Sequence, residues 1–177
     1  MPHLDAVAIE ASLRMLPPPG RDHGVVRLLV QRLPGEARLN PERVILDVAQ
    51  GVLGDRWSLG GAPNPEAQVT LMRHDVACLL SAGGDPSMLG DNLFVDIDTS
   101  AENLPPGTVL QIGDALCAVT PKPHTGCHKF AARVGAEALA LTRASGWKQM
   151  QLRGVHLRVL EGGAVELGDT ARVLRRP

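Results

Sequence analysis

The sequence predicts a mainly β fold, a barrel or a sandwich, with a few peripheral helices. Three observations favour it. Short runs rich in valine, leucine and isoleucine recur along the chain, glycine and proline turns separate these runs, and few stretches have helical spacing. The 177 residues contain no repeat, low-complexity segment or linker, and their number suits one domain. We therefore expect an N-terminal helical extension over residues 1–20 and a single domain over residues 21–177.

Three helices are expected from spacing and from their stop signals. The first covers residues 4–15, ends before a run of prolines, and is placed on the outside of the domain. The second covers residues 74–82 and ends at a glycine pair. The third covers residues 127–144 and is rich in alanine, with a break expected at Gly135.

Short β-branched runs between turn signals define the strands. In chain order they lie at residues 25–30, 43–48, 68–72, 93–97, 109–112, 115–120, 154–160, 164–166 and 171–174. The dipeptide Gly113-Asp114 predicts a hairpin between two of them. We also expect residues 154–160 to pair with residues 164–166 across the turn at 161–163, and the last strand to close the sheet.

Composition excludes several classes of protein. Hydrophobic residues make up 44% of the chain but aromatic residues only 2%, so aliphatic side chains must fill the core. The lack of aromatic residues argues against a platform that stacks nucleic-acid bases. Lysine and arginine number 18 against 19 acidic residues, which leaves no basic excess for a phosphate backbone. We expect no nucleic-acid partner.

The three cysteines indicate a reducing compartment, because an odd number argues against a disulfide framework. The N-terminus has early acidic residues and no long apolar run, unlike a signal peptide. No stretch has the length and polarity of a bilayer-spanning helix. We expect a cytoplasmic protein that does not associate with membranes.

Cys127 is the strongest candidate for chemistry. It follows the rigid segment PKPHTG and opens a predicted helix, where backbone N–H groups stabilise an anion. Lys122, His124, His128 and Lys129 add positive charge nearby, and both effects favour a reactive thiolate. The alternative is a free cysteine packed as a small hydrophobe. That is the expectation for Cys78 and Cys117, which lie within apolar runs.

Other residues allow two interpretations each. Arg56 offers a planar fork for a phosphate, and Asp55 could hold that arginine in place, or the two could form an ordinary surface pair in a turn. Arg153 could clasp a phosphate or be solvated. Asn92, at a strand start, is typical of a residue that satisfies loop backbone groups. A zinc site at His124, Cys127 and His128 is disfavoured, since adjacent residues seldom reach one metal ion.

Several segments match one family in chain order. They are GVLGDRW (51–57), QVTLM (68–72), GDNLFV (90–95), LPPGTVLQIGDA (104–115), VTPKPHTGCHKFAARVG (119–135) and RGVHLRVLEGGAVELGD (153–169). From about Gly24 to Leu174 the chain resembles the MOSC domain, named for the C-terminal domain of molybdenum cofactor sulfurase, in a stand-alone bacterial-type form. Two departures stand out. Relatives usually have Glu-Asn in place of Asp91-Asn92, and often histidine in place of Trp57.

The resemblance implies a barrel-like fold and a role in molybdenum-cofactor (molybdopterin) or sulfur-transfer chemistry. The signature cysteine of the family falls on Cys127, which relatives are thought to use as a persulfide or as a molybdenum ligand. It implies cofactor-binding roles for Asp55, Arg56, Asn92, Thr120, Lys122, His124, Thr125, Lys129 and Arg153. The sequence shows neither a pyridoxal-phosphate desulfurase domain nor a ferredoxin-like cysteine cluster, so electrons or sulfur are expected from a separate partner.

Three hypotheses follow. In the first, the protein binds the molybdenum cofactor through Cys127 and reduces N-hydroxylated compounds with electrons from a redox partner. In the second, it is a sulfur carrier whose Cys127 thiolate takes sulfur from a cysteine desulfurase and passes it to an acceptor. In the third, it is a non-enzymatic β-barrel module that binds a small anion, and Cys127 is incidental.

Overall fold

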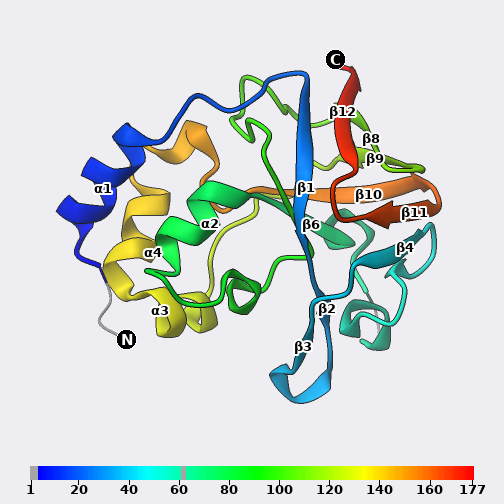
Figure 1. Ribbon diagram of the computed structural model, residues 1–177, viewed down its shortest axis with the longest axis horizontal. Helices are drawn as coiled ribbons and strands as arrows, with labels where there is room; N and C mark the ends of the chain where they lie inside the picture. Colours follow the sequence, from blue (N-terminus) through cyan, green and yellow to red (C-terminus); the bar gives the residue numbers. More distant parts are fainter. Residues whose placement is uncertain (1–3, 61–62) are drawn as a thin grey trace.

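The fold is mainly β with peripheral helices, as the sequence predicts. The computed structural model describes residues 4–60 and 63–177. Seven strands close a barrel, in the order β1 (His23–Leu29), β12 (Thr170–Arg175), β8 (Val109–Ile112), β9 (Ala115–Val119), β10 (Val155–Glu161), β6 (Val69–Arg73) and β7 (Leu93–Val95). Neighbouring strands are antiparallel, except β6 and β7, which are parallel. Figure 1 shows the barrel strands on one side and most of the helices on the other.

The hairpin between β8 and β9 is confirmed. Ile112 pairs with Ala115, so the chain reverses across Gly113 and Asp114. Gly113 has a φ of 54°, and a Cβ there would lie 2.6 Å from the carbonyl oxygen of Ala164. Only glycine satisfies both constraints without strain.

The expected pairing of residues 154–160 with residues 164–166 is wrong. Strand β11 (Gly163–Glu166) pairs instead with β4 (Arg43–Asp47), whose other edge pairs with β5 (Gly51–Val52). The reason is that β9 and β6 already occupy both edges of β10 inside the barrel. Strand β11 therefore finds no free edge on β10, and the chain leaves the barrel after β10 to form a separate sheet of β11, β4 and β5.

A two-stranded hairpin of β2 (Gln31–Arg32) and β3 (Arg38–Leu39) extends from the barrel (Figure 1). Its turn, Pro34–Glu36, contains the dipeptide Pro34-Gly35, and these two short strands were not expected from the sequence. The hairpin turn brings Glu36 to the helical side of the molecule, where its carboxylate pairs with Lys129 and Arg133.

The helices lie outside the barrel. They are α1 (Ala6–Met15), α2 (His74–Leu80), α3 (His128–Val134) and α4 (Ala136–Arg143), with short 3-10 helices at Arg56–Leu59, Pro65–Ala67, Pro86–Leu89 and Lys148–Met150. The Asp5 carboxylate caps α1, which packs on α2 and α4 through Ile9 and Leu13. Gly135, with a φ of 98°, separates α3 from α4 as expected.

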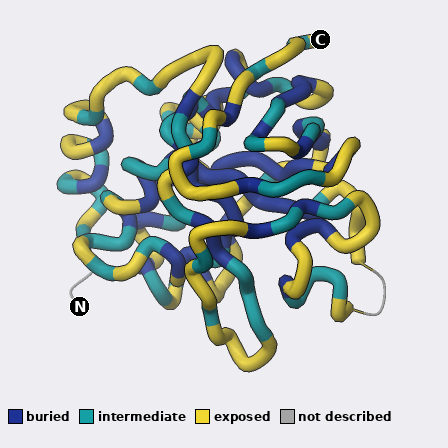
Figure 2. Tube along the Cα trace, turned by 45° about the vertical axis from the view of Figure 1, so that its right-hand side comes forward, coloured by how far each residue is buried: buried dark blue, intermediate teal, exposed yellow. Residues whose placement is uncertain are grey.

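Two apolar clusters form the core. The larger fills the barrel with aliphatic side chains and Cys117, and the smaller lies between the barrel and the helices around Met72, Phe94 and Phe130. Figure 2 shows the buried positions following the barrel strands. Aliphatic residues do fill the interior, as the composition requires. No helix of residues 4–60 and 63–177 has both the length and the apolar character needed to span a bilayer.

Candidate functional site

Cys127 lies where the loop after β9 meets α3, as the N-cap of that helix, and its side chain is exposed. Burial raises the pKa of the Cys127 thiol, but the backbone amides of Phe130 and Lys129 and the charge of Arg153 more than offset this effect. The thiol pKa therefore lies below its ordinary value, which favours the thiolate. The expectation that Cys127 opens a helix is confirmed.

Contacts at both ends hold the loop that precedes Cys127. The Thr120 hydroxyl donates to the carbonyl of Glu66 at 2.6 Å, and the Arg143 guanidinium donates to the carbonyl of Gly126. A Cβ at Gly126 would come within 2.8 Å of the Phe130 ring. The loop is thus anchored to the barrel at its start and packed tightly against α3 at its end.

Arg153 is the buried cation beside Cys127. Its Nη1 donates to Asp91 Oδ2 at 2.9 Å and contacts the sulfur of Met72 at 3.1 Å, and its guanidinium lies 4.2 Å from the ring centre of Phe130. Arg153 is 5% exposed and Asp91 is fully buried. Burial alone would raise the pKa of Asp91, but the charge of Arg153 outweighs it, so the carboxyl stays ionised.

His124 joins this pair from the loop. Its Nε2 lies 3.4 Å from Arg153 Nη2 and 3.5 Å from Asp91 Oδ1. Burial lowers the pKa of His124 to about 3, so the ring is neutral. With the ring proton on Nδ1, Nε2 accepts from the Arg153 guanidinium, which can only donate. The His124 ring also packs against the His156 ring, with the centroids 4.4 Å apart and the planes tilted by 50°, and His156 Nδ1 contacts the carbonyl of Lys122 at 3.2 Å.

Three buried polar atoms of this cluster have no hydrogen-bond partner among the described residues: Asp91 Oδ1, His124 Nδ1 and Arg153 Nε. Leaving such groups unpaired costs about 1–3 kcal/mol each. Buried donors and acceptors without partners are expected where a ligand or ordered water completes the network.

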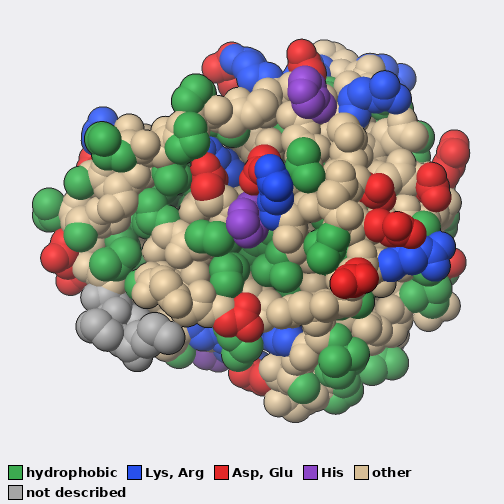
Figure 3. Space-filling view, viewed as in Figure 1, with side chains coloured by type: hydrophobic (Ala, Val, Ile, Leu, Met, Phe, Trp, Pro, Cys, Tyr) green, Lys and Arg blue, Asp and Glu red, His purple; other side chains and the backbone are tan. Residues whose placement is uncertain are grey.

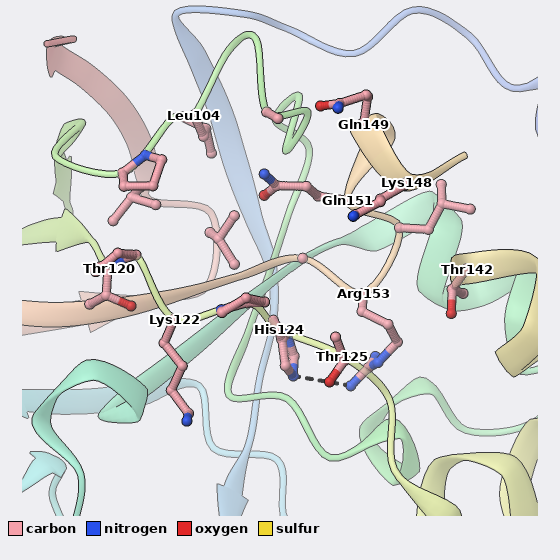
Figure 4. Close-up of a pocket in the computed structure, with 18 of the residues that line it drawn as sticks. Leu104, Thr120, Lys122, His124, Thr125, Thr142, Lys148, Gln149, Gln151 and Arg153 are labelled. Carbon is pink, nitrogen blue, oxygen red and sulfur yellow. Dashed lines mark hydrogen bonds between the residues drawn. The ribbon is translucent and has the colours of Figure 1, made fainter. Parts of the chain in front are cut away.

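A cavity of about 440 Å³ opens next to this cluster. Figure 4 shows Thr120 and Lys122 on one side, and Lys148 and Gln151 on the other. The lining residues at the loop and the start of β10 include Thr120, Lys122, His124, Thr125 and Arg153, all of them candidates from the sequence. Cys127 is not part of the lining, but it follows two residues after Thr125, which is.

Asp55 holds Arg32 and not Arg56. Its carboxylate accepts from Arg32 Nε at 2.9 Å, from the Trp57 amide at 2.9 Å and from Asn92 Nδ2 at 2.9 Å. The Asp55 side chain is 1% exposed, and its pKa is lowered because Arg32 and the amides outweigh burial. Asp55 and Asn92 are therefore brought together, but with their polar atoms turned toward each other and toward the protein.

Lys129 and Arg56 lie on the hairpin side of α3. Lys129 Nζ pairs with Glu36 of the hairpin turn at 2.5 Å, and Arg133 pairs with the same carboxylate at 3.0 Å. Hydrogen bonds from both cations lower the pKa of Glu36 to about 2. The Arg56 side chain makes no hydrogen bond or ion pair with any described residue, so it is available to a ligand.

Sequence reasoning missed the partners of several candidates. Asp91 was noted only as a departure from the family pattern, and its pairing with Arg153 joins residues 62 positions apart. Arg32 and His156 carry no local motif at all. The one available signal was charge, since Asp91 is an acidic residue that opens a buried apolar strand and must find a cation.

Comparisons with known proteins identify the family. The model of the family described as "MOSC domain" matches residues 73–172, more than half of the chain, and the chain belongs to that family. No curated protein sequence matches the chain.

Three solved structures share the fold. The YuaD protein of Bacillus subtilis is 16% identical with a TM-score of 0.62, covering 85% of this chain and 95% of its own. A hypothetical protein is 17% identical with a TM-score of 0.67, covering 88% and 70%. YiiM from Escherichia coli is 18% identical with a TM-score of 0.58, covering 85% and 71%. At these identities the likeness concerns the fold alone.

Proposed function

We propose that this protein binds the molybdenum cofactor and that the Cys127 thiolate is a ligand of its metal. The observation that carries the proposal is an exposed thiol of lowered pKa, beside the charge of the buried Arg153 and two residues along the chain from Thr125, which lines the cavity. Thiolate is the protein donor that thiophilic transition metals prefer. Membership of the MOSC family supports the same cofactor.

The residues present fit such a group. A pterin carries several hydrogen-bonding edges and a phosphate, and the site offers an unpaired donor on His124 Nδ1, an unpaired acceptor on Asp91 Oδ1 and the donor Nε of Arg153. Lys122, which lines the cavity, adds a cation for an anionic ligand. These residues, with Thr120 and Thr125 of the same loop, would hold the cofactor.

The residues have distinct tasks in this proposal. Cys127 presents its sulfur on a loop that is fixed at both ends. Arg153 keeps a positive charge beside that sulfur, and Asp91 compensates the buried charge. His124 is neutral, so it supplies hydrogen bonds without adding charge. When bound, the cofactor supplies two-electron redox chemistry, and we propose N-hydroxylated compounds as the substrate class, with electrons from a separate redox partner in the cytoplasm.

Metal analysis tests this proposal. The protein is purified from a host that makes the cofactor, as wild type, Cys127→Ala and Cys78→Ala. We expect molybdenum near one per chain, together with pterin fluorescence after oxidation, in the wild type and in Cys78→Ala. Loss of molybdenum in Cys127→Ala alone supports the thiolate ligand. Wild-type protein free of both molybdenum and pterin would overturn the proposal.

A second function is favoured by the exposure of Cys127, which leaves its sulfur open to another protein. As a sulfur carrier, the Cys127 thiolate attacks the outer sulfur of a desulfurase persulfide. The donor S–S bond breaks, the donor thiolate leaves, and Cys127 becomes the persulfide. Intact-mass measurement after incubation with a cysteine desulfurase and cysteine should show one added sulfur in the wild type and none in Cys127→Ser. If Cys127→Ser alters neither molybdenum binding nor sulfur loading, the third hypothesis, a β-barrel module that binds a small anion, is favoured.

A further inference from the structure

A second cluster of reactive side chains lies on α2, away from the Cys127 loop. His74 begins this helix and Cys78 follows four residues later, so both project from one face. His74 Nε2 lies 3.5 Å from Cys78 Sγ, and Cys78 is exposed. The expectation that Cys78 packs as a small hydrophobe is therefore wrong. Figure 3 looks onto this side of the molecule, where a histidine, acidic and basic side chains gather over α2 and β1.

The separation of the two atoms fits two ligands of one tetrahedral metal ion. Zinc binds thiolate sulfur at about 2.3 Å and imidazole nitrogen at about 2.0–2.1 Å. At a tetrahedral angle, these bond lengths place sulfur and nitrogen about 3.5 Å apart. The His74 and Cys78 atoms already have this spacing, so a metal ion can bridge them without a change in the helix.

Asp96 completes the arrangement from the end of β7. Its Oδ1 lies 3.9 Å from His74 Nδ1, within reach of a hydrogen bond after a small rotation of the ring. A metal-binding histidine commonly donates its second ring N–H to a carboxylate, which fixes the tautomer and the ring orientation. Arg27 pairs with the other oxygen of Asp96 and holds that carboxylate in place.

A cysteine, a histidine and an aspartate in line also resemble a nucleophilic triad, but the electrostatics disfavour that role. Burial raises the pKa of the Cys78 thiol, and the charges of Asp75 and Asp96 raise it further. A neutral thiol is a poor nucleophile. The same negative surroundings favour a cation that replaces the thiol proton. Asp75 itself is held by Arg73 through both oxygens, at 2.6 Å each, so it is not free to bind a metal.

We propose that His74 and Cys78 form a surface site for Zn²⁺ or a similar thiophilic divalent cation, with Asp96 as a positioning residue. Binding displaces the Cys78 proton to solvent, and water fills the remaining positions. Within residues 4–60 and 63–177, no group of three or more His, Cys, Asp or Glu side chains is placed to hold a metal ion. The chain thus supplies two ligands, and we expect exchangeable binding, since closed structural zinc sites use four.

Cobalt titration tests the site independently of the molybdenum cofactor. Metal-free protein is titrated with Co²⁺, whose bond to a thiolate gives a near-ultraviolet charge-transfer band. In the wild type and in Cys127→Ser, we expect the charge-transfer band to saturate at one equivalent of Co²⁺ and to disappear when Zn²⁺ displaces the Co²⁺. In Cys78→Ser we expect no band. Asp96→Asn should weaken Co²⁺ binding by about 10-fold or more. Glu102→Gln is the matched control, which neutralises an exposed carboxylate that pairs with Arg21 and not with His74, and it should leave the affinity unchanged.

Thermal melting gives a second readout. A ligand that binds only the folded state raises the melting temperature. Zn²⁺ should therefore raise the melting temperature of the wild type and not that of Cys78→Ser. The melting temperature without metal shows whether each variant folds. The proposal is overturned if the wild type shows no band, or if the band persists in Cys78→Ser and is lost in Cys127→Ser.

Discussion

Arg153 and Asp91 form a buried ion pair, 2.9 Å from Nη1 to Oδ2, at the floor of the Cys127 site. The pair joins Arg153, two residues before β10, to Asp91, two residues before β7. Burying the Arg153 guanidinium without a counter-ion would cost a large desolvation free energy. The Asp91 carboxylate offsets this cost and so allows a positive charge next to the thiol. Arg153 Nη2 and Asp91 Oδ1 both lie close to Nε2 of the neutral His124 ring, at 3.4 Å and 3.5 Å.

Removing one partner of this pair should destabilise the fold strongly. In Asp91→Asn the charge of Arg153 stays buried without compensation, and we expect a loss of about 3–5 kcal/mol in the free energy of unfolding. Urea denaturation measures it. The exposed pair Arg21–Glu102 is the matched control. Glu102→Gln should leave the urea midpoint unchanged, because exposed ion pairs contribute little. Equal midpoints for Asp91→Asn and the wild type would contradict this account of the site.

Asp55 should make the protein sensitive to acid. Burial is the largest effect and raises its pKa, but Arg32 and backbone amides reverse the sign, so the folded pKa lies below the ordinary value of 3.8. A carboxyl with a depressed pKa contributes stability that is present above the unfolded value and is lost as the pH falls through the folded value. We expect unfolding free energy to fall below pH about 4.

Asp55→Asn should lose stability at neutral pH and show a smaller further loss in acid than the wild type. The measurement is urea denaturation at several pH values. Asp47→Asn serves as a control, since the Asp47 carboxylate accepts hydrogen bonds only from the amides of Ala49 and Gln50 in its own turn. Parallel pH profiles for the wild type and Asp55→Asn would show that Asp55 does not act in this way.

The sequence was informative where structure is local. The Gly113-Asp114 hairpin, the break at Gly135 and the helix that starts after Cys127 depend on backbone conformations that a few neighbouring residues determine. Pairings across the chain were not readable. Nothing near Asp55 indicates Arg32, 23 positions away, and β11 pairs with β4 only because the barrel leaves β10 without a free edge. Such choices depend on the whole topology, and a single sequence contains no direct record of them.

Because of His124, the free energy of unfolding should decrease as the pH falls below neutrality. Burial lowers its folded pKa to about 3, against an ordinary value of 6.5, so the unfolded chain binds a proton that the folded chain does not. Stability is therefore full above the ordinary value and declines as the pH falls from there toward the folded value. His124→Gln should flatten this part of the profile. An NMR titration should show the His124 ring neutral at pH about 5, and a ring that protonates at its ordinary pKa would contradict the burial argument.

Cys127 should react faster than Cys78 with an uncharged alkylating agent, although both thiols are exposed. Amides and Arg153 lower the pKa of Cys127, whereas burial and two carboxylates raise that of Cys78. Only the thiolate reacts, so at neutral pH iodoacetamide should modify Cys127 first. Burial raises the pKa of Cys117 to about 12, so this cysteine should react only when the protein unfolds. Peptide mass mapping over time follows each site. The rate at Cys127 should rise with pH through a midpoint below that of a free thiol, and equal rates at Cys127 and Cys78 would remove the electrostatic basis for a special role of Cys127.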